Sequence, residues 1–179
     1  MKVGRMGRTV GVFVSSTMLL ASSAALAIRV GDTVGPVEVG DANDHPTPIP
    51  ELGTKVIVLF YTDPDVKEQN EPFRDFLKAK NLDPAKVRGM GVVNMKDTWK
   101  PDFAIRRAVR EKLKKFPLSL ILTDPEHALQ KSWSLGDCDD KDLVIIIGKD
   151  RKVAFFKAGK LEPAEMEPAF GIIKDLMAR

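Results

Sequence analysis

The apolar positions of the chain fall into runs that predict five strands. The run at 56–61 joins β-branched and aromatic residues without interruption, which is typical of a central strand buried on both faces. Shorter apolar runs predict strands at 90–93 and 118–122. Two more runs, 143–147 and 153–156, are separated by a polar segment of hairpin length, so the last two strands are expected to pair with each other.

Helical spacing predicts a helix after each of the first two strands. Asp63 can cap a helix and Pro64 can occupy its first position, and Pro72 is then expected to kink or interrupt it. The segment 101–116 carries an apolar stripe at helical spacing. That stripe consists of Ile105, Val109, Leu113 and Phe116.

The C-terminal half adds two helices and completes the predicted fold. A short helix is expected at 127–133, and a final amphipathic helix begins at either Pro163 or Pro168. Strands that alternate with helices and then end in a hairpin and a helix indicate one α/β domain with a mixed sheet. We assign this domain to residues 54–179. Residues 28–53 are rich in Gly, Pro, Asp and Asn and are expected to form a lead-in with short extended pieces.

The first 27 residues have the pattern of a secretory signal peptide. Three basic residues precede a charge-free stretch that ends in Ala25-Leu26-Ala27, the small-x-small pattern that signal peptidase cleaves. Cleavage is expected before Ile28. The protein is therefore expected to be periplasmic or secreted, with no membrane anchor after cleavage.

The positive net charge of the chain comes from this N-terminal segment. The whole chain has 28 basic and 25 acidic residues, and residues 1–27 contribute Lys2, Arg5 and Arg8 but no acid. The mature chain would therefore carry 25 of each, which gives no electrostatic support for binding nucleic acid. A partner, if there is one, is expected to be a periplasmic protein or peptide.

The cysteine count excludes several classes of function. One cysteine cannot form an internal disulfide, a dithiol redox pair or a cysteine-rich zinc site. With only His45 and His127, a histidine-based metal site is not expected, and neither is any cofactor. The hydrophobic fraction of 44% is too high for a disordered chain.

The segment Tyr61-Thr62-Asp63-Pro64-Asp65 resembles the active-site segment of thioredoxins, which place Trp-Cys-Gly-Pro-Cys between a strand and a helix. Thr62 and Asp65 stand where the two cysteines would be. More closely, the chain resembles the YtfJ-type family of exported thioredoxin-like proteins. The points of similarity are Val66-Lys67-Glu68-Gln69-Asn70, Val93-Asn94 with Asp97, Phe103 with Arg106, Lys149-Asp150 and the closing amphipathic helix. The resemblance implies a thioredoxin-like fold and an exported protein, but no established activity.

If the fold is thioredoxin-like, the loop before the hairpin approaches the turn after the first strand. The residues expected to share a cleft there are Thr62, Asp63, Asp65 and Cys138. Dithiol exchange is excluded at this turn because neither cysteine position supplies sulfur. Cys138 is a candidate nucleophile for a single-thiol enzyme. However, the carboxylates around it disfavour the reactive thiolate, so an incidental thiol is the alternative that we prefer.

Two charged groups have further candidate roles. The acidic loop, together with Asp63 and Asp65, offers carboxylates to a hard cation such as calcium, but solvated loop charge is the explanation that we prefer. The loop residues are Asp137, Asp139, Asp140 and Asp142. The helix 101–116 is strongly basic, and an acidic partner or lipid headgroups are alternatives to an ordinary solvated face. Its partner-surface candidates are Arg106, Arg107 and Arg110.

Three functions therefore stay open at this level. The first, which the sequence favours, is a non-catalytic binding or accessory module that has lost the redox dithiol. The second is a single-cysteine peroxidase or reductase that uses Cys138. The third is a protein that docks on a partner through its basic helix 101–116.

Overall fold

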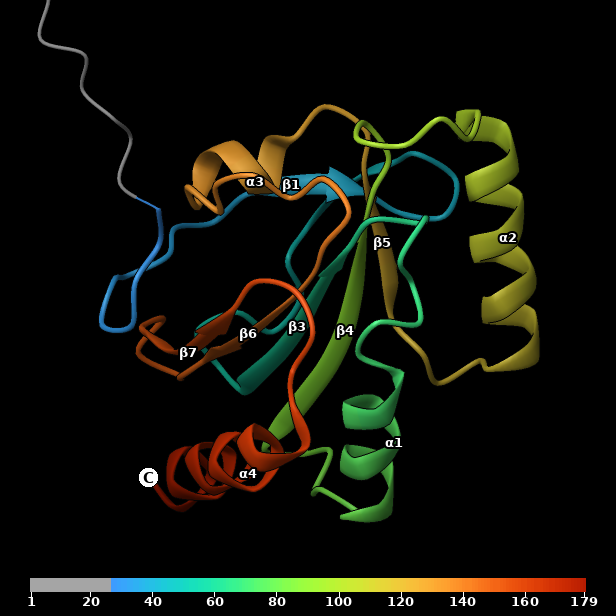
Figure 1. The fold of residues 1–179 in the computed structure, drawn as a ribbon. Helices are drawn as coiled ribbons and strands as arrows, with labels where there is room; N and C mark the ends of the chain where they lie inside the picture. Colours follow the sequence, from blue (N-terminus) through green and yellow to red (C-terminus); the bar gives the residue numbers. More distant parts are fainter. Residues whose placement is uncertain (1–26) are drawn as a thin grey trace, which may run out of the picture.

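The computed structural model describes residues 27–179, so the expected signal peptide lies outside the described part except for Ala27. A seven-stranded mixed sheet forms the centre, with the strand order β2-β1-β5-β4-β3-β6-β7 (Figure 1). Its strands are β1 (Glu38–Gly40), β2 (Pro46–Pro48), β3 (Val56–Thr62), β4 (Val87–Asn94), β5 (Ile121–Asp124), β6 (Asp142–Ile147) and β7 (Val153–Lys157). Within residues 27–179, no helix is long and apolar enough to span a bilayer.

Strand β3 is central because each of its seven residues is buried, as its uninterrupted apolar run predicts. It runs parallel to β4 and antiparallel to β6, and β4 runs parallel to β5. Strands β6 and β7 form the predicted hairpin. The α/β class with a mixed sheet is therefore confirmed.

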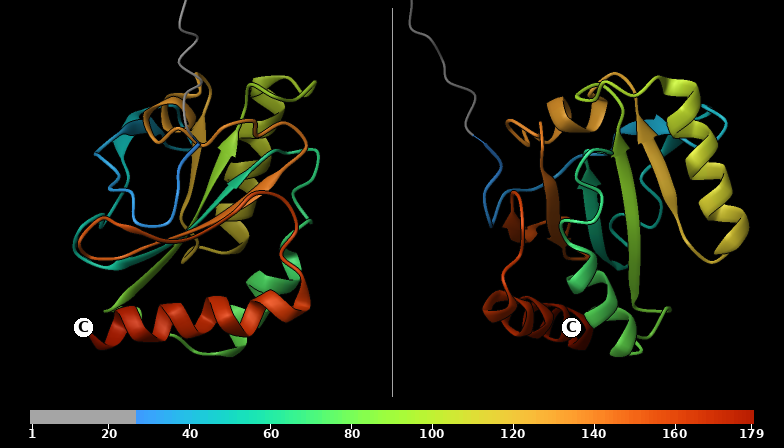
Figure 2. Two further views of the ribbon diagram at one scale, coloured as in Figure 1. Left: turned by 60° about the vertical axis from the view of Figure 1, so that its left-hand side comes forward. Right: turned by 45° about the vertical axis from the view of Figure 1, so that its right-hand side comes forward.

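Helices cover both faces of the sheet (Figure 2). They are α1 (Glu71–Ala79), α2 (Asp102–Lys115), α3 (Ala128–Ser132) and α4 (Pro163–Ala178). Alternate residues of β3 point to opposite faces. Val58 and Phe60 pack with α1 and α4, whereas Leu59 and Tyr61 pack with α3 and with the lead-in.

The lead-in is part of the same sheet. Strand β1 pairs with β5 through Gly40 and Thr123, so the segment 28–53 extends the sheet beyond the parallel strands. Gly40 is required at this contact because a Cβ atom there would lie 2.6 Å from the Thr123 hydroxyl. Ile28, Val34 and Ile49 of the lead-in are buried in the core.

Three element boundaries differ from the sequence predictions. Helix α1 begins at Glu71 rather than after Asp63, and Pro72 lies in its first turn, where a missing N–H costs nothing and no kink is needed. Strand β5 begins three residues later than expected, leaving Leu118 exposed. Strand β4 begins at Val87, three residues earlier than expected. Helix α4, in contrast, begins at Pro163, one of its two predicted starts, and continues through Pro168.

Candidate functional site

Buried polar side chains gather at the edge of the sheet where the parallel strands β3, β4 and β5 end. The carboxyl ends of parallel strands meet at one edge, and β6 begins at this same edge because Asp142 pairs with Thr62. We call this group of residues the carboxyl-edge cluster. Its buried members are Thr62, Asp63, Asn70, Asn94, Thr123, Asp124 and Asp142.

Thr62, at the first of the two cysteine positions, is hydrogen-bonded inside the protein. Its hydroxyl donates to Asp142 Oδ1 at 2.7 Å and accepts from Arg74 Nη2 at 3.1 Å. Arg74 also forms an ion pair with Asp142 Oδ2 at 2.9 Å. Burial raises the pKa of the Asp142 carboxyl, and the nearby Arg74 guanidinium opposes that rise. Thr62 therefore belongs to a closed polar network.

Two amide side chains tie the turn after β3 to this network. Asn70 Nδ2 donates to the backbone oxygen of Asp142 at 2.7 Å, and Asn70 Oδ1 accepts from the Leu161 N–H at 2.8 Å. Gln69 Oε1 accepts from the Asp142 N–H at 2.9 Å. The segment 63–70 is therefore held by side-chain bonds, although it lies outside regular helix and strand.

Asp65, at the second cysteine position, is bound by the loop that precedes α2. Its carboxylate pairs with Lys100 Nζ and accepts from the Thr98 hydroxyl at 2.8 Å. The hydrogen bond from Lys100 is the largest cause of a lowered pKa at Asp65. Thr62 and Asp65, at the positions that resemble those of the thioredoxin cysteines, thus both form contacts that stabilise the local fold.

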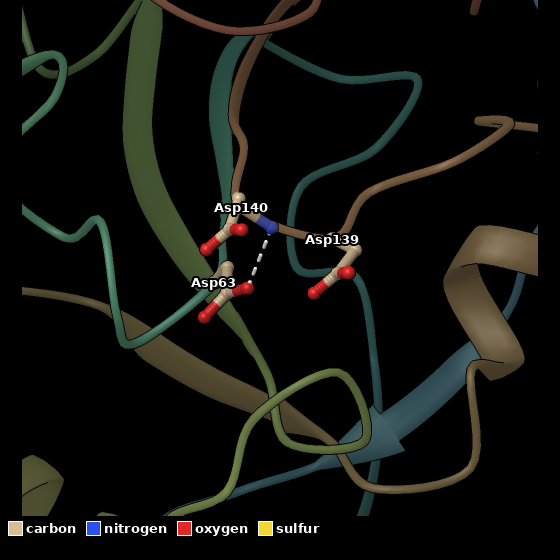
Figure 3. Close-up of side chains that lie close together, drawn as sticks. All are labelled: Asp63, Asp139 and Asp140. Atoms are coloured by element: carbon tan, nitrogen blue, oxygen red, sulfur yellow. Dashed lines mark hydrogen bonds between the residues drawn. The ribbon is translucent and has the colours of Figure 1, made fainter.

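Asp63 joins the same turn to the loop before β6, as Figure 3 shows. Its carboxylate accepts from the Asp65 N–H at 2.8 Å and from the Asp140 N–H at 2.9 Å. Burial is the main reason that the pKa of Asp63 is raised. Asp63 was predicted to cap the helix that follows, and this is wrong because α1 begins eight residues later.

The acidic residues that were candidate cation ligands do not all lie together in the structure. Oxygens of Asp63, Asp139 and Asp140 lie within 4.8 Å of one another, and Asp139 and Asp140 are exposed. Asp137 instead pairs with Lys141, and Asp142 is buried against Arg74. Both oxygens of Asp63 accept hydrogen bonds from backbone N–H groups. These bonds between the turn and the loop explain why the three carboxylates lie close together.

Cys138 lies in the core rather than at the exposed edge. It is fully buried in the apolar cluster that includes Tyr61, Leu129 and Trp133. Burial, followed by the charges of Asp97 and Asp137, raises the pKa of the thiol to about 12. The expected placement of Cys138 in a cleft with Thr62 and Asp65 is therefore not what the structure has, because apolar side chains cover the thiol.

Two features of the cluster were not predicted from the sequence. The Tyr61 hydroxyl donates to Asp124 Oδ2 at 3.0 Å, and the Asp124 carboxylate also accepts from the N–H groups of Ala128 and Leu129 at 2.7 and 3.0 Å. Asp124 thus joins the sheet to the start of α3. The only available signal was the position of Asp124 directly after a predicted strand.

The second feature is the contact of His127 with β4 and the loop after it. Its Nε2 lies 3.2 Å from Asn94 Oδ1 and 3.1 Å from Asp97 Oδ2, and Asn94 Nδ2 donates to Asp97 at 2.7 Å. The sequence predicted only that His127 would stand at the start of a short helix. Its partners lie about 30 residues earlier, a separation at which sequence spacing gives no signal.

The three basic residues predicted for a partner surface have different roles. Arg106 is only 18% exposed and pairs with Asp44 at 2.8 Å, which ties α2 to the lead-in. Arg107 is 76% exposed and pairs with Glu111 at 2.9 Å. Arg110 is exposed, and its guanidinium donates to the backbone oxygen of Ala42. Only Arg107 and Arg110 therefore contribute to an outer surface.

Comparison with known proteins gives a family and a fold. Residues 51–176 match the family described as "Bacterial protein of unknown function (YtfJ_HI0045)". An uncharacterized protein of Haemophilus influenzae is 24% identical over 111 residues, which cover 62% of this chain and 59% of the relative. The match thus spans about three fifths of that relative's length.

Solved structures support the fold alone. The pneumococcal exposed lipoprotein thioredoxin of Streptococcus pneumoniae has a TM-score of 0.58 at 14% identity, covering 79% of this chain and 100% of that one. A peroxiredoxin-like protein of Aquifex aeolicus has a TM-score of 0.56 at 13% identity, covering 83% and 90% respectively. The predicted thioredoxin-like fold is therefore confirmed.

Proposed function

The chain belongs to the YtfJ_HI0045 family of bacterial proteins of unknown function, and from this premise we propose that it is an exported thioredoxin-fold protein that binds a partner without exchanging disulfides. The observation that carries the proposal is the chemistry of the carboxyl-edge cluster. Thr62 and Asp65 occupy the sulfur positions and are bound to Asp142 and Lys100. This edge therefore lacks the thiols that disulfide exchange requires, but it can still bind a partner.

The exposed part of this edge supports a binding role. Asp139 and Asp140 are exposed beside Asp63, and neither forms an ion pair within the described chain. The loop that carries them is fixed through the bond from Asp140 to Asp63, and Asp63 is in turn bonded to Asp65. A surface held in one arrangement loses less conformational entropy when it binds.

A photo-crosslinking experiment tests the binding role. A photoreactive amino acid replaces Asp139 in the full-length chain expressed in its native host, and irradiation is expected to give discrete adducts with a protein or peptide. The matched control carries the same group at Lys149, an exposed position in the β6–β7 turn. Absence of adducts at position 139, or the same adducts at both positions, would contradict the proposal.

Export is tested by the N-terminus of the protein as cells produce it. Mass spectrometry of the protein recovered from the periplasm or the medium is expected to give a chain that begins at Ile28. Replacing Ala25 and Ala27 by large residues should block this cleavage, because signal peptidase requires small residues there. Retention of an intact N-terminus in the cytoplasm would contradict export.

The single-cysteine enzyme is the competing candidate, and the position of Cys138 weighs against it. A thiol with a pKa of about 12 is almost entirely protonated at neutral pH. Peroxide consumption by the wild type is expected to equal that of Cys138→Ser and of buffer alone. A rate that is lost in Cys138→Ser would favour the enzyme instead.

A further inference from the structure

Helix α2 has an exposed outer face, on which Arg107 pairs with Glu111 of the same helix and Arg110 donates to the Ala42 carbonyl. The inner face packs through Ile105 and Val109 against β4 and β5. Phe103, Arg107, Arg110 and Lys114 follow at spacings of four, three and four, so they lie along one stripe on the other side of the helix. Figures 1 and 2 show α2 at an outer side of the molecule, away from α4.

Large apolar side chains are exposed at both ends of this helix. Trp99, just before α2, is 83% exposed, and Phe103 in its first turn is 73% exposed. Leu118, just after the helix, is 93% exposed, and Phe116 beside it is also exposed. A helix of 14 residues is about 20 Å long, so these apolar groups are separated by the length of the helix.

The helix between the two apolar ends is strongly basic. Five basic side chains accompany a single acid, Glu111, once Arg106 is set aside with its partners Asp44 and Asp102. The five are Arg107, Arg110, Lys112, Lys114 and Lys115, all exposed. The mature chain as a whole would have as many acids as bases, so this excess of positive charge is local.

We propose that the outer face of α2 docks on a surface of anionic phospholipid. Such a surface offers phosphates to the basic stripe and, just below them, an apolar boundary that accepts aromatic side chains. A protein interface normally buries an apolar centre inside a polar rim, whereas here the apolar groups lie at the ends and the charges between them. A convex helix with this arrangement fits an extended plane better than a pocket.

Tryptophan fluorescence tests the proposal directly, since the chain has two tryptophans and one of them is buried. Trp133 is in the core and donates its indole N–H to Gly35, so a change on adding vesicles reports on Trp99. Residues 28–179 contain every described strand and helix, and a cooperative melt of that fragment would establish that it folds without the apolar N-terminal segment. Vesicles of phosphatidylcholine with phosphatidylglycerol are expected to shift the emission to the blue, and pure phosphatidylcholine is not.

Charge-reversal variants separate the helix face from general electrostatics. Arg107→Glu with Lys114→Glu is expected to weaken vesicle sedimentation at least about tenfold, and rising salt should weaken it further. Lys86→Glu with Lys149→Glu changes the net charge equally at exposed positions elsewhere and should bind as the wild type does. Trp99→Phe should keep binding and lose the emission shift, whereas Trp99→Ala with Phe103→Ala should lose binding.

Three results would overturn the proposal. They are no binding to anionic vesicles, equal binding to neutral vesicles, and binding that both charge-reversal pairs reduce alike. If polyglutamate binds in a manner that depends on Arg107 and Lys114 while vesicles do not, the face serves an acidic protein instead. The photo-crosslinking result at Asp139 is independent of all of these outcomes, because Asp139 lies in the loop before β6 and not on α2.

Discussion

The guanidinium of Arg74 and the carboxylate of Asp142 form a buried ion pair across 68 residues of sequence, with Nη2 2.9 Å from Oδ2. Arg74 also lies over the ring of Phe60, with 4.2 Å between its Cζ and the ring centroid. The pair thus joins α1 to the start of β6 beside the position that carries the first cysteine in thioredoxins. Removing one partner leaves the other charge buried without compensation.

We expect Arg74→Met to lower the free energy of unfolding by about 3–5 kcal/mol near neutral pH. Burial already raises the pKa of Asp142, and loss of the guanidinium raises it further. Asp142 is therefore protonated at a higher pH in the variant than in the wild type. The difference in stability between the two proteins shrinks as the pH falls. Urea unfolding at about pH 7 and about pH 4.5 measures this.

The matched control is Arg88→Met, which removes a partly exposed pair with Glu51. It is expected to cost less than about 1 kcal/mol. Adding Asp142→Asn to Arg74→Met should recover part of the loss, since the unpaired charge is gone. A deficit in Arg74→Met that stays constant with pH would show that the ionised Asp142 is not its cause.

Cys138 is expected to resist thiol reagents in the folded protein. With a pKa of about 12 for the folded thiol, the thiolate fraction at pH 8 is about one in ten thousand. Labelling by a chromogenic disulfide reagent should be at least about a thousandfold slower in buffer than in denaturant. Equal rates in the two conditions would place the thiol at the surface.

Tyr61 gives a second test of the core at this edge, because it is the only tyrosine of the chain. Burial, and then the charge of Asp124, raise the pKa of its hydroxyl above the ordinary value. In an alkaline titration, tyrosinate absorbance is therefore expected to appear only together with loss of the far-ultraviolet circular dichroism signal. Ionisation near pH 10 in a folded chain would contradict the hydrogen bond to Asp124.

His127 adopts a left-handed backbone with φ of 56°, which asparagine tolerates and β-branched residues do not. His127→Val is therefore expected to be less stable than His127→Asn by about 1–2 kcal/mol. Both variants lose the contacts to Asp97 and Asn94, so the difference isolates the backbone. The same two changes at His45, which has no positive φ, should not show this difference. Thermal melts compare the four variants.

The sequence predicted features that depend on local periodicity. The buried run at 56–61 and the spacing of Ile105 and Val109 place β3 and α2 correctly, because each pattern reports one face of one element. Phe116, in the same apolar stripe, is exposed because it lies at the C-terminal end of the helix, where the chain turns away.

The carboxyl-edge cluster was predicted only in part. The meeting of the 63–65 turn with the acidic loop followed from the resemblance to thioredoxins, and the bond from Asp140 to Asp63 joins them. The pairing of Arg74 with Asp142 and the contacts of His127 depend on register between distant elements, which no spacing along the chain encodes. Burial of Cys138 likewise depends on α3 and the lead-in, which pack over it.

We propose that the protein has a thioredoxin-like scaffold without thiol chemistry. Insulin reduction in the presence of dithiothreitol tests it most directly, with wild type, Cys138→Ser and a dithiol thioredoxin as positive control. We expect wild type and Cys138→Ser both to proceed at the rate of dithiothreitol alone. A faster rate with the wild type that Cys138→Ser abolishes would contradict it.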